Sequence, residues 1–333
     1  AALGGFFLTA VPNWTGAKAA RHAFIATAAG AWLAGRIAVW FSGALPPVAV
    51  AVVDLAFLPL LAARIATQLI RRPKPANVMF LGLLALIWIA NLLVHLDWTG
   101  LARGTLDAGM RAGLYGLCAM IAVLGGRVTP AFTRNALVRS GRETGLPVSR
   151  RVFEAPGVAL AVALPIAVLT GLPAAAIGAV ALACGLAQLA RLAGWRTAAV
   201  LDQPILWSLH LAFAMLGLGY VLTGLAAFGL GNPVAPLHVL GIGAVGGMTL
   251  AVMSRATLGH SGRPLVAPPG VALAYGLLSA AAALRWWSAT LPGPWSQPAL
   301  ILAGTLWIAA FALFVVALWP AFWGPRAAAA TGE

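Results

Sequence analysis

Residues 298–322 read PALILAGTLWIAAFALFVVALWPAF, a continuous apolar run that contains no charged side chain. A helix that crosses the hydrocarbon layer of a membrane needs roughly 20 such residues, because each one adds 1.5 Å. Lipid offers no partner for an unpaired backbone group, so a chain crosses it only as helices or as a closed barrel. A barrel shows short segments of alternating hydrophobicity. This run therefore predicts a membrane-spanning α-helix.

The composition of the whole chain agrees with this prediction. The chain has 333 residues, of which 62% are hydrophobic and only 8% are charged. Its mean hydropathy is +0.95. A soluble domain has roughly 25% charged residues, so a soluble globular protein is excluded. We predict an all-α fold, a polytopic transmembrane helix bundle that forms a single transmembrane domain over residues 1–333.

Similar apolar runs recur along the chain and predict about ten complete membrane spans. Residues 1–12 resemble the last half of a further helix, and the chain does not begin with Met. We therefore expect the sequence to be truncated at its N-terminus, with a first helix missing. The ten predicted spans cover approximately residues 22–44, 46–70, 76–95, 105–127, 157–171, 173–194, 204–228, 236–254, 267–290 and 298–322.

The net charge of +14 does not indicate nucleic-acid binding, because most Lys and Arg residues lie in short loops between apolar runs. Most of these basic residues form one set, which lies at the helix ends on one side of the predicted bundle. The loops on the opposite side contain few basic residues other than Arg103 and Arg285. Basic loops stay cytoplasmic and meet anionic lipid, so this set is expected to face the cytoplasm. It comprises Lys18, Arg21, Arg71, Arg72, Lys74, Arg127, Arg134, Arg139, Arg142, Arg150, Arg151, Arg191, Arg196, Arg255, Arg263 and Arg326.

A weak internal repeat also runs through the chain. Three predicted helices end on the basic face in related motifs, VPNWT at 11–15, TPAFT at 129–133 and RATLGH at 255–260. The motifs are separated by roughly four spans, which returns the chain to the same side of the membrane. The repeat predicts three four-helix units, with the first helix absent.

The five histidines are the first candidates for chemistry, because ionisable groups in membrane spans are costly and neutral imidazole is a common metal ligand. His95 and His238 lie at the outer ends of their spans and are expected to share one layer. His210 lies inside a span, His260 follows the end of another, and His22 reads as an interfacial anchor. No two of them are three or four residues apart, so no local metal motif is present. Solvation by water at a helix end is the alternative for His95 and His238, and ordering of a polar loop for His260.

A second constellation joins Arg36 and Asp54. Both lie about nine residues from the turn near residue 45, so they are expected at equal depth on adjacent antiparallel helices. A buried ion pair is the favoured reading, and proton transfer is the alternative. Few other acids lie within the spans, which argues against proton-coupled turnover. The two cysteines, Cys118 and Cys184, are expected to be buried packing residues without a disulfide.

Basic residues also cluster in the predicted loop 127–151 and in the polar segment around residues 255–263. One interpretation is that these basic residues set the orientation of the chain in the membrane and contact anionic lipid. Arg127, Arg255 and Arg263 could alternatively bind an acidic group such as a haem propionate or an anionic lipid, because arginine forms paired hydrogen bonds with carboxylate and phosphate.

Three strings carry a resemblance to a known family. They read LTAVPNWTG at 8–16, GRVTPAFTRNAL at 126–137 and MSRATLGHSGRPL at 253–265. They are long and unusual, they span nearly the whole chain, and they resemble signatures of the NnrS family.

This resemblance implies a twelve-helix protein of the bacterial cytoplasmic membrane that contains haem and copper and takes part in the response to nitric oxide and in denitrification. It implies His95, His210, His238 and His260 as metal ligands, with His95, His238, His210 and the three arginines near the cofactors. The family normally has an N-terminal segment with a His/Glu motif, which this sequence lacks. Twelve helices in three units also resemble the catalytic subunit of haem-copper oxidases, which is an analogy of architecture only.

Two classes of function therefore stand at this point. The first is a haem- and copper-binding membrane protein with nitric oxide as ligand, either as a haem-copper-type oxidoreductase or as a binding protein. Its partners are membrane lipids and not nucleic acid, and its electron donor is unknown. The second is a multi-span transporter or a protein that delivers a metal cofactor without keeping haem. Spans interrupted by Gly or Pro, such as the one with Pro165, permit the second class.

Overall fold

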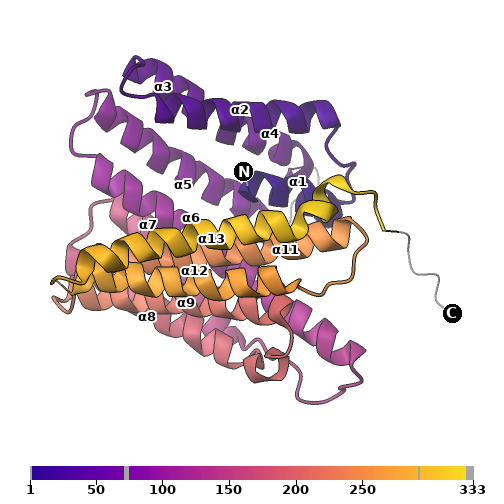
Figure 1. Ribbon diagram of the computed structural model, residues 1–333. Helices are drawn as coiled ribbons and strands as arrows, with labels where there is room; N and C mark the ends of the chain where they lie inside the picture. The colour runs from indigo at the N-terminus through magenta and orange to yellow at the C-terminus, as the bar shows by residue number, and fades with distance from the viewer. Residues whose placement is uncertain (1, 71–74, 292, 328–333) are drawn as a thin grey trace. The chain divides into compact units, whose positions relative to one another are not determined.

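The computed structural model describes residues 2–70, 75–291 and 293–327, and within them the chain forms helices and no strand (Figure 1). The prediction of an all-α fold is confirmed. The helices are α1 (Ala2–Thr15), α2 (His22–Trp40), α3 (Pro47–Leu55), α4 (Phe57–Leu69), α5 (Pro75–Trp98), α6 (Leu106–Arg139), α7 (Arg151–Leu169), α8 (Ala174–Ala193), η1 (Thr197–Val200), α9 (Pro204–Ala227), α10 (Ala235–His238), η2 (Val239–Gly246), α11 (Gly247–His260), α12 (Pro269–Thr290) and α13 (Ser296–Trp323).

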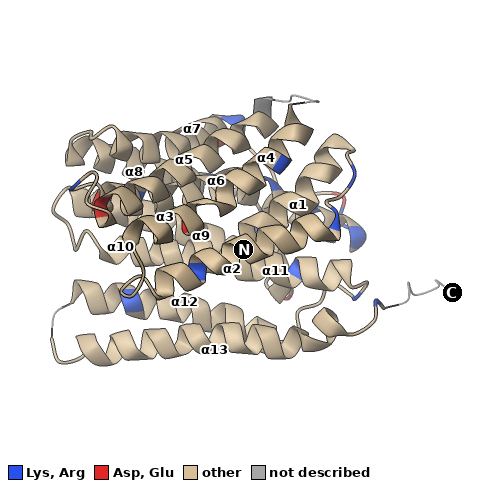
Figure 2. Cartoon of the chain, turned by 90° about the horizontal axis from the view of Figure 1, so that it is seen from above, with Lys and Arg blue, Asp and Glu red and all other residues tan. Residues whose placement is uncertain are grey.

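Nine helical segments in the described part of the chain are long and apolar enough to cross a membrane. They coincide with nine of the ten predicted spans. The tenth, α12, forms a helix of 22 residues but is not among the nine, because Tyr275, Arg285 and several small residues lower its hydropathy. Figure 2 shows how sparse charged residues are along the helices. Large apolar side chains such as Val316, which is 72% exposed, have the character of a lipid-facing surface.

Two predicted helix ends were wrong, and α7 begins at Arg151 and not at residue 157. Helix α6 does not end at residue 127 but continues to Arg139, so Arg127, Arg134 and Asn135 lie on a helix and not in a loop. The extension is stable because one of its faces is buried, at Thr129, Thr133, Ala136 and Leu137 among others. The motif at 129–133 therefore lies inside a helix.

The other boundary concerns the end of α11, which continues past residue 254 and includes His260 as its last residue. The predicted interruption at Pro165 is also absent, because α7 runs through this residue. Three residues of the predicted basic face, Arg71, Arg72 and Lys74, lie outside the described residues.

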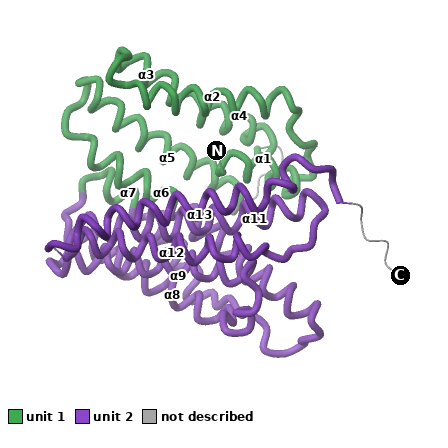
Figure 3. The backbone as a smooth tube through the Cα atoms, viewed as in Figure 1, with its two compact units in different colours: residues 1–117, 165–171 green, residues 118–164, 172–333 purple. Residues whose placement is uncertain are grey.

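The contacts divide the chain into two compact units (Figure 3). Unit 1 comprises Ala1–Leu117 and Pro165–Gly171, and unit 2 comprises Cys118–Leu164 and Leu172–Glu333. The three four-helix units inferred from the repeat stay a prediction.

Close approach of helices in unit 2 depends on small residues. A Cβ atom at Gly185 of α8 would lie 2.6 Å from the carbonyl oxygen of Gly217 on α9, and one at Gly224 would lie 2.8 Å from the carbonyl oxygen of Gly178. Small residues let the backbones of membrane helices pack directly against each other. Cys118 and Cys184 are both buried and free in this unit, as expected.

Candidate functional site

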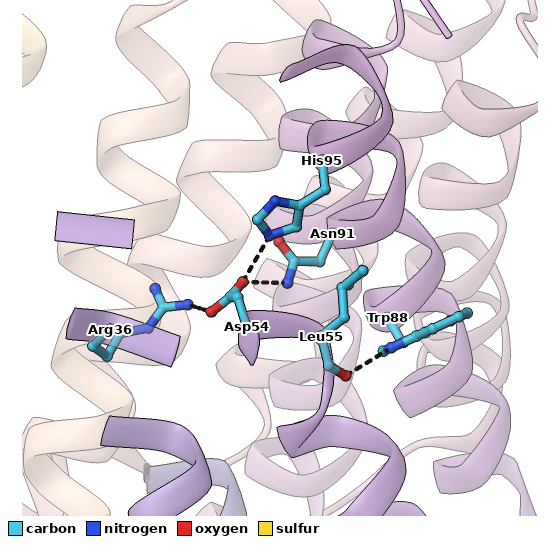
Figure 4. Close-up of polar contacts among 6 residues, drawn as sticks. All are labelled: Arg36, Asp54, Leu55, Trp88, Asn91 and His95. Carbon is cyan, nitrogen blue, oxygen red and sulfur yellow. Dashed lines mark hydrogen bonds and ion pairs between the residues drawn. The ribbon is translucent and has the colours of Figure 1, made fainter. Parts of the chain in front are cut away.

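Unit 1 contains a buried polar cluster centred on Asp54 of α3. Its carboxylate accepts hydrogen bonds from Asn91 Nδ2 at 2.9 Å and from His95 Nε2 at 3.0 Å, both from α5, and it forms an ion pair with Arg36 of α2 (Figure 4). The predicted ion pair between Arg36 and Asp54 is confirmed. Arg36 is 50% exposed while Asp54 is buried, so the charge is compensated from the rim of the cluster.

Two features of the sequence build this cluster. Gly35 has no side chain, and a Cβ atom there would lie 2.9 Å from Asp54 Oδ1 and 3.0 Å from Asp54 Cα, so glycine lets α2 approach α3 closely. The helical hydrogen bonding of the span Pro47–Leu69 is also interrupted at Ala56, between α3 and α4, although the backbone of Ala56 stays in the helical region. Pro59 has no N–H to donate to the carbonyl oxygen of Leu55, and Trp88 Nε1 donates to that oxygen at 3.0 Å instead (Figure 4).

His95 keeps one ring nitrogen free. Its side chain is 2% exposed, and Nδ1 is buried with no hydrogen-bond partner. Because an ionised carboxylate only accepts hydrogen bonds, Nε2 carries the proton that is donated to Asp54. In the neutral ring Nδ1 then has a lone pair. This is the arrangement of a metal-ligating histidine, whose second nitrogen donates to a carboxylate or carbonyl group.

His238 shows the opposite assignment of its two nitrogens. It ends α10, and its Nδ1 donates to the carbonyl oxygen of Val234 at 3.1 Å. The ring is partly exposed, and no hydrogen bond to Nε2 is found in the described part of the chain. The segment that follows, η2, is a π-helix of eight residues. Stretches of π-helix occur frequently at functional sites.

His210 is the most deeply buried histidine, with 1% exposure, but neither of its nitrogens is free. Nε2 is bonded to the hydroxyl of Thr133 at 2.8 Å, and Nδ1 to that of Thr197 at 2.9 Å. A metal could bind only by replacing one of these bonds. The geometry therefore gives His210 a role in joining α6, η1 and α9.

The remaining predicted ligand, His260 at the end of α11, lies on the surface. His22 at the start of α2, which was predicted to be an interfacial anchor, is also exposed. The shared layer expected for His95 and His238, which belong to different units, stays a prediction. Within the described ranges, no group of three or more His, Cys, Asp or Glu side chains could hold a metal ion together.

Protein groups already contact the arginines that were predicted to bind an acidic group. The Arg255 guanidinium lies over the ring of Phe132, 3.9 Å from its centroid. Arg263 Nη2 donates to the carbonyl oxygen of Pro320 at 2.7 Å, near the end of α13. Arg127 is exposed on α6.

Sequence reasoning missed two participants and misplaced one. Asn91 lies four residues before His95, on the same face of α5, and this spacing was an available signal. Trp88, which donates to the free carbonyl oxygen of Leu55, was not considered. Arg191, expected among the basic helix ends, is buried in unit 2 with only 5% exposure.

Comparison with known proteins identifies the family. No curated protein and no solved structure matches the chain. The family model described as "NnrS protein" matches residues 1–326, nearly the whole sequence. This match agrees with the three signature-like strings and with the bundle of membrane-spanning helices. The chain belongs to the NnrS family.

Proposed function

We propose that this chain is a multi-pass protein of the bacterial inner membrane that binds haem and copper and takes part in the response to nitric oxide. Membership of the NnrS family supports the link to nitric oxide. The observation that supports metal binding is the free, buried Nδ1 of His95, opposite a nitrogen held by Asp54. Burying an imidazole nitrogen without a partner is costly, and a metal ion would remove this cost.

His95 suits a compact ion better than haem. Its free nitrogen, Nδ1, is adjacent to the ring carbon that bears Cβ, so the main chain of α5 crowds the approach of a porphyrin plane. A single ion such as copper is small enough to reach it, and imidazole is a ligand that copper accepts. Asp54 would fix the ring orientation and the tautomer, and Asn91 and Arg36 would hold Asp54.

His238 suits the iron of haem. Its Nδ1 donates to a backbone carbonyl, which leaves Nε2, the nitrogen furthest from the main chain, to act as ligand. A single imidazole would be sufficient to hold haem iron, which would supply the chemistry for binding a diatomic ligand such as nitric oxide. His238 is also partly exposed, so a large planar cofactor would not have to enter a closed core.

The hydrogen bonds of the buried acid Asp54 favour binding of nitric oxide over its proton-coupled turnover. Asp54, the acid buried next to His95, already accepts from three donors. A carboxylate held in this way positions its neighbours and is poorly placed to deliver protons to a bound ligand. Basic helix ends on the cytoplasmic side complete the proposed topology.

Two helix interruptions favour the alternative, a transporter or a cofactor-delivery protein. Transporters place substrate sites at broken helices within the membrane. The break at Ala56 lies beside Asp54, and the π-helix η2 follows His238 directly. The two functions differ in one measurable property, which is whether the purified protein retains a metal cofactor.

The test is a reduced-minus-oxidised optical spectrum with metal analysis of the detergent-purified full-length protein. We expect His238→Ala to remove the haem spectrum and its response to nitric oxide, and His95→Ala to remove copper while haem remains. His22→Ala, an exposed histidine, is the matched control and should keep both. A folded wild-type protein without haem or copper would refute the proposal and favour the transporter.

A further inference from the structure

Unit 2 contains a buried guanidinium that forms no contact ion pair with an acid among the described residues, although Glu154 of α7 lies close enough to interact with its charge. Arg191 near the end of α8 is 5% exposed, and in the described part of the chain no carboxylate lies within ion-pair distance of it. Its Nη1 donates to the carbonyl oxygen of Ala122 at 2.9 Å and to Gln188 Oε1 at 2.7 Å. No acceptor is found for Nε or Nη2 among the described residues, so one edge of the guanidinium keeps its N–H groups unused.

A second donor in the same cluster also lacks an acceptor. The ring of Trp195 lies 5.7 Å from the guanidinium carbon of Arg191, and Trp195 Nε1 is buried without a hydrogen-bond partner. An indole nitrogen only donates, as does a guanidinium. The cluster therefore has more hydrogen-bond donors than acceptors, and an anion would supply the missing acceptors.

Packing alone accounts for only part of this arrangement. Arg191 contacts the faces of Trp195 and Phe213, the second at 5.4 Å. The attraction of a cation to aromatic rings offsets only part of the loss of hydration of a buried charge. Two glycines make room for the side chain, since a Cβ atom at Gly126 would collide with Nη2 and one at Gly157 would lie 3.1 Å from Cδ.

The position of the cluster separates it from the proposed haem. Arg191 precedes η1 and the start of α9, whereas His238 follows the other end of that helix. With 24 residues, α9 is about 36 Å long at 1.5 Å per residue. A haem held by His238 could not bring a propionate to Arg191.

We propose that Arg191 and Trp195 form a binding site for a small planar oxyanion from solution, of the class of formate, nitrite and nitrate. The edge formed by Nε and Nη2 presents parallel N–H donors, whose geometry matches two oxygens of one planar anion. Trp195 Nε1 supplies a further donor. This site is separate from the proposed metal ligands.

The test measures the thermal unfolding midpoint of the detergent-purified full chain against formate, nitrite and nitrate at constant ionic strength, because a ligand that binds only the folded state raises this midpoint. Equilibrium dialysis with labelled formate or nitrate gives Kd. Chloride and perchlorate, which are not planar, are the controls. We expect Trp195→Phe, which keeps a ring but loses the N–H, to weaken binding about tenfold, as expected for one hydrogen bond to a charged group.

Three further results decide the proposal. Arg191→Lys keeps the charge but not the paired donors and should weaken binding by at least about tenfold, and Arg191→Met should abolish it. If Arg191→Met does not fold, the Lys and Phe variants decide. Equal shifts with all five anions, unchanged affinity in Trp195→Phe and Arg191→Lys, or no shift in the wild type would each overturn the proposal.

Discussion

The cluster around Asp54 in unit 1 and the cluster around Arg191 in unit 2 differ in what they leave unsatisfied. Asp54 accepts from three donors, and the atom of this cluster that lacks a hydrogen-bond partner is an acceptor, His95 Nδ1. Among the described residues, Arg191 finds acceptors only for its Nη1. The groups of this cluster that lack a hydrogen-bond partner are therefore donors, and they include Trp195 Nε1. A leftover acceptor favours a cation, and leftover donors favour an anion.

The comparison also shows that residue type is a poor guide to ligands inside a membrane bundle. His210 is as deeply buried as His95, yet both of its nitrogens are bonded to threonine hydroxyls. Unused hydrogen-bonding capacity distinguishes a candidate ligand from a structural polar residue.

The largest effect on stability is expected from removing the central charge of the Asp54 cluster, and a much smaller one from removing that of the Arg191 cluster. Asp54→Ala should lower the free energy of unfolding by about 3–5 kcal/mol, because His95 and Asn91 lose their acceptor and the charge of Arg36 its partner. In the absence of planar oxyanions, Arg191→Met should be much milder, because replacing a buried charge by an apolar side chain of similar length is often neutral. Thermal and denaturant unfolding in detergent measure both. Similar losses would mean that Arg191 is as well compensated as Asp54, and the comparison would fail.

The sequence predicted the Arg36–Asp54 ion pair of the first cluster but not the two residues of α5 that complete it. Arg36 and Asp54 could be paired because equal distances from one turn give equal depth on antiparallel helices. The spacing of Asn91 and His95 places both on one face of α5, but the sequence does not show that this face meets Asp54, because the helix is otherwise apolar almost all round. Asn91 and His95 were therefore not connected to the pair.

The extension of α6 and the burial of Arg191 were missed for different reasons. A hydropathy criterion detects only the lipid-crossing part of a helix. The continuation of α6 to Arg139 lies beyond that part, and it is held by a buried face rather than by an apolar sequence. Arg191 was assigned to a basic helix end by charge alone. The pair Gly125-Gly126 signalled a close approach, but the partner of a glycine cannot be read from the sequence.

A substitution at Gly126 tests whether the position of Arg191 depends on close contact with the backbone of α6. Gly126→Ala should lower the free energy of unfolding by up to about 3 kcal/mol, because the new methyl group collides with Arg191 Nη2 and must move it. It should also abolish oxyanion binding. The adjacent Gly125→Ala is the matched control, since its Cβ would meet the terminal methyl of Met248 at 3.0 Å, and a flexible side chain can adjust. Equal effects of the two variants on oxyanion binding would show that Arg191 is not held against Gly126.

The smallest effect concerns the backbone beside Asp54. Trp88→Phe should cost about 1 kcal/mol, the lower end of the range for an unsatisfied carbonyl, because the bond to the Leu55 oxygen is only partly buried. Pro59→Ala would restore an N–H that can donate to the same oxygen. The double variant should therefore lose less stability than the two single effects predict, and a double-mutant cycle measures this coupling. Strict additivity would show that the indole and the proline act independently. In that case side-chain packing, and not the hydrogen bond that Trp88 donates to the Leu55 carbonyl oxygen in place of residue 59, would hold the backbone beside Asp54.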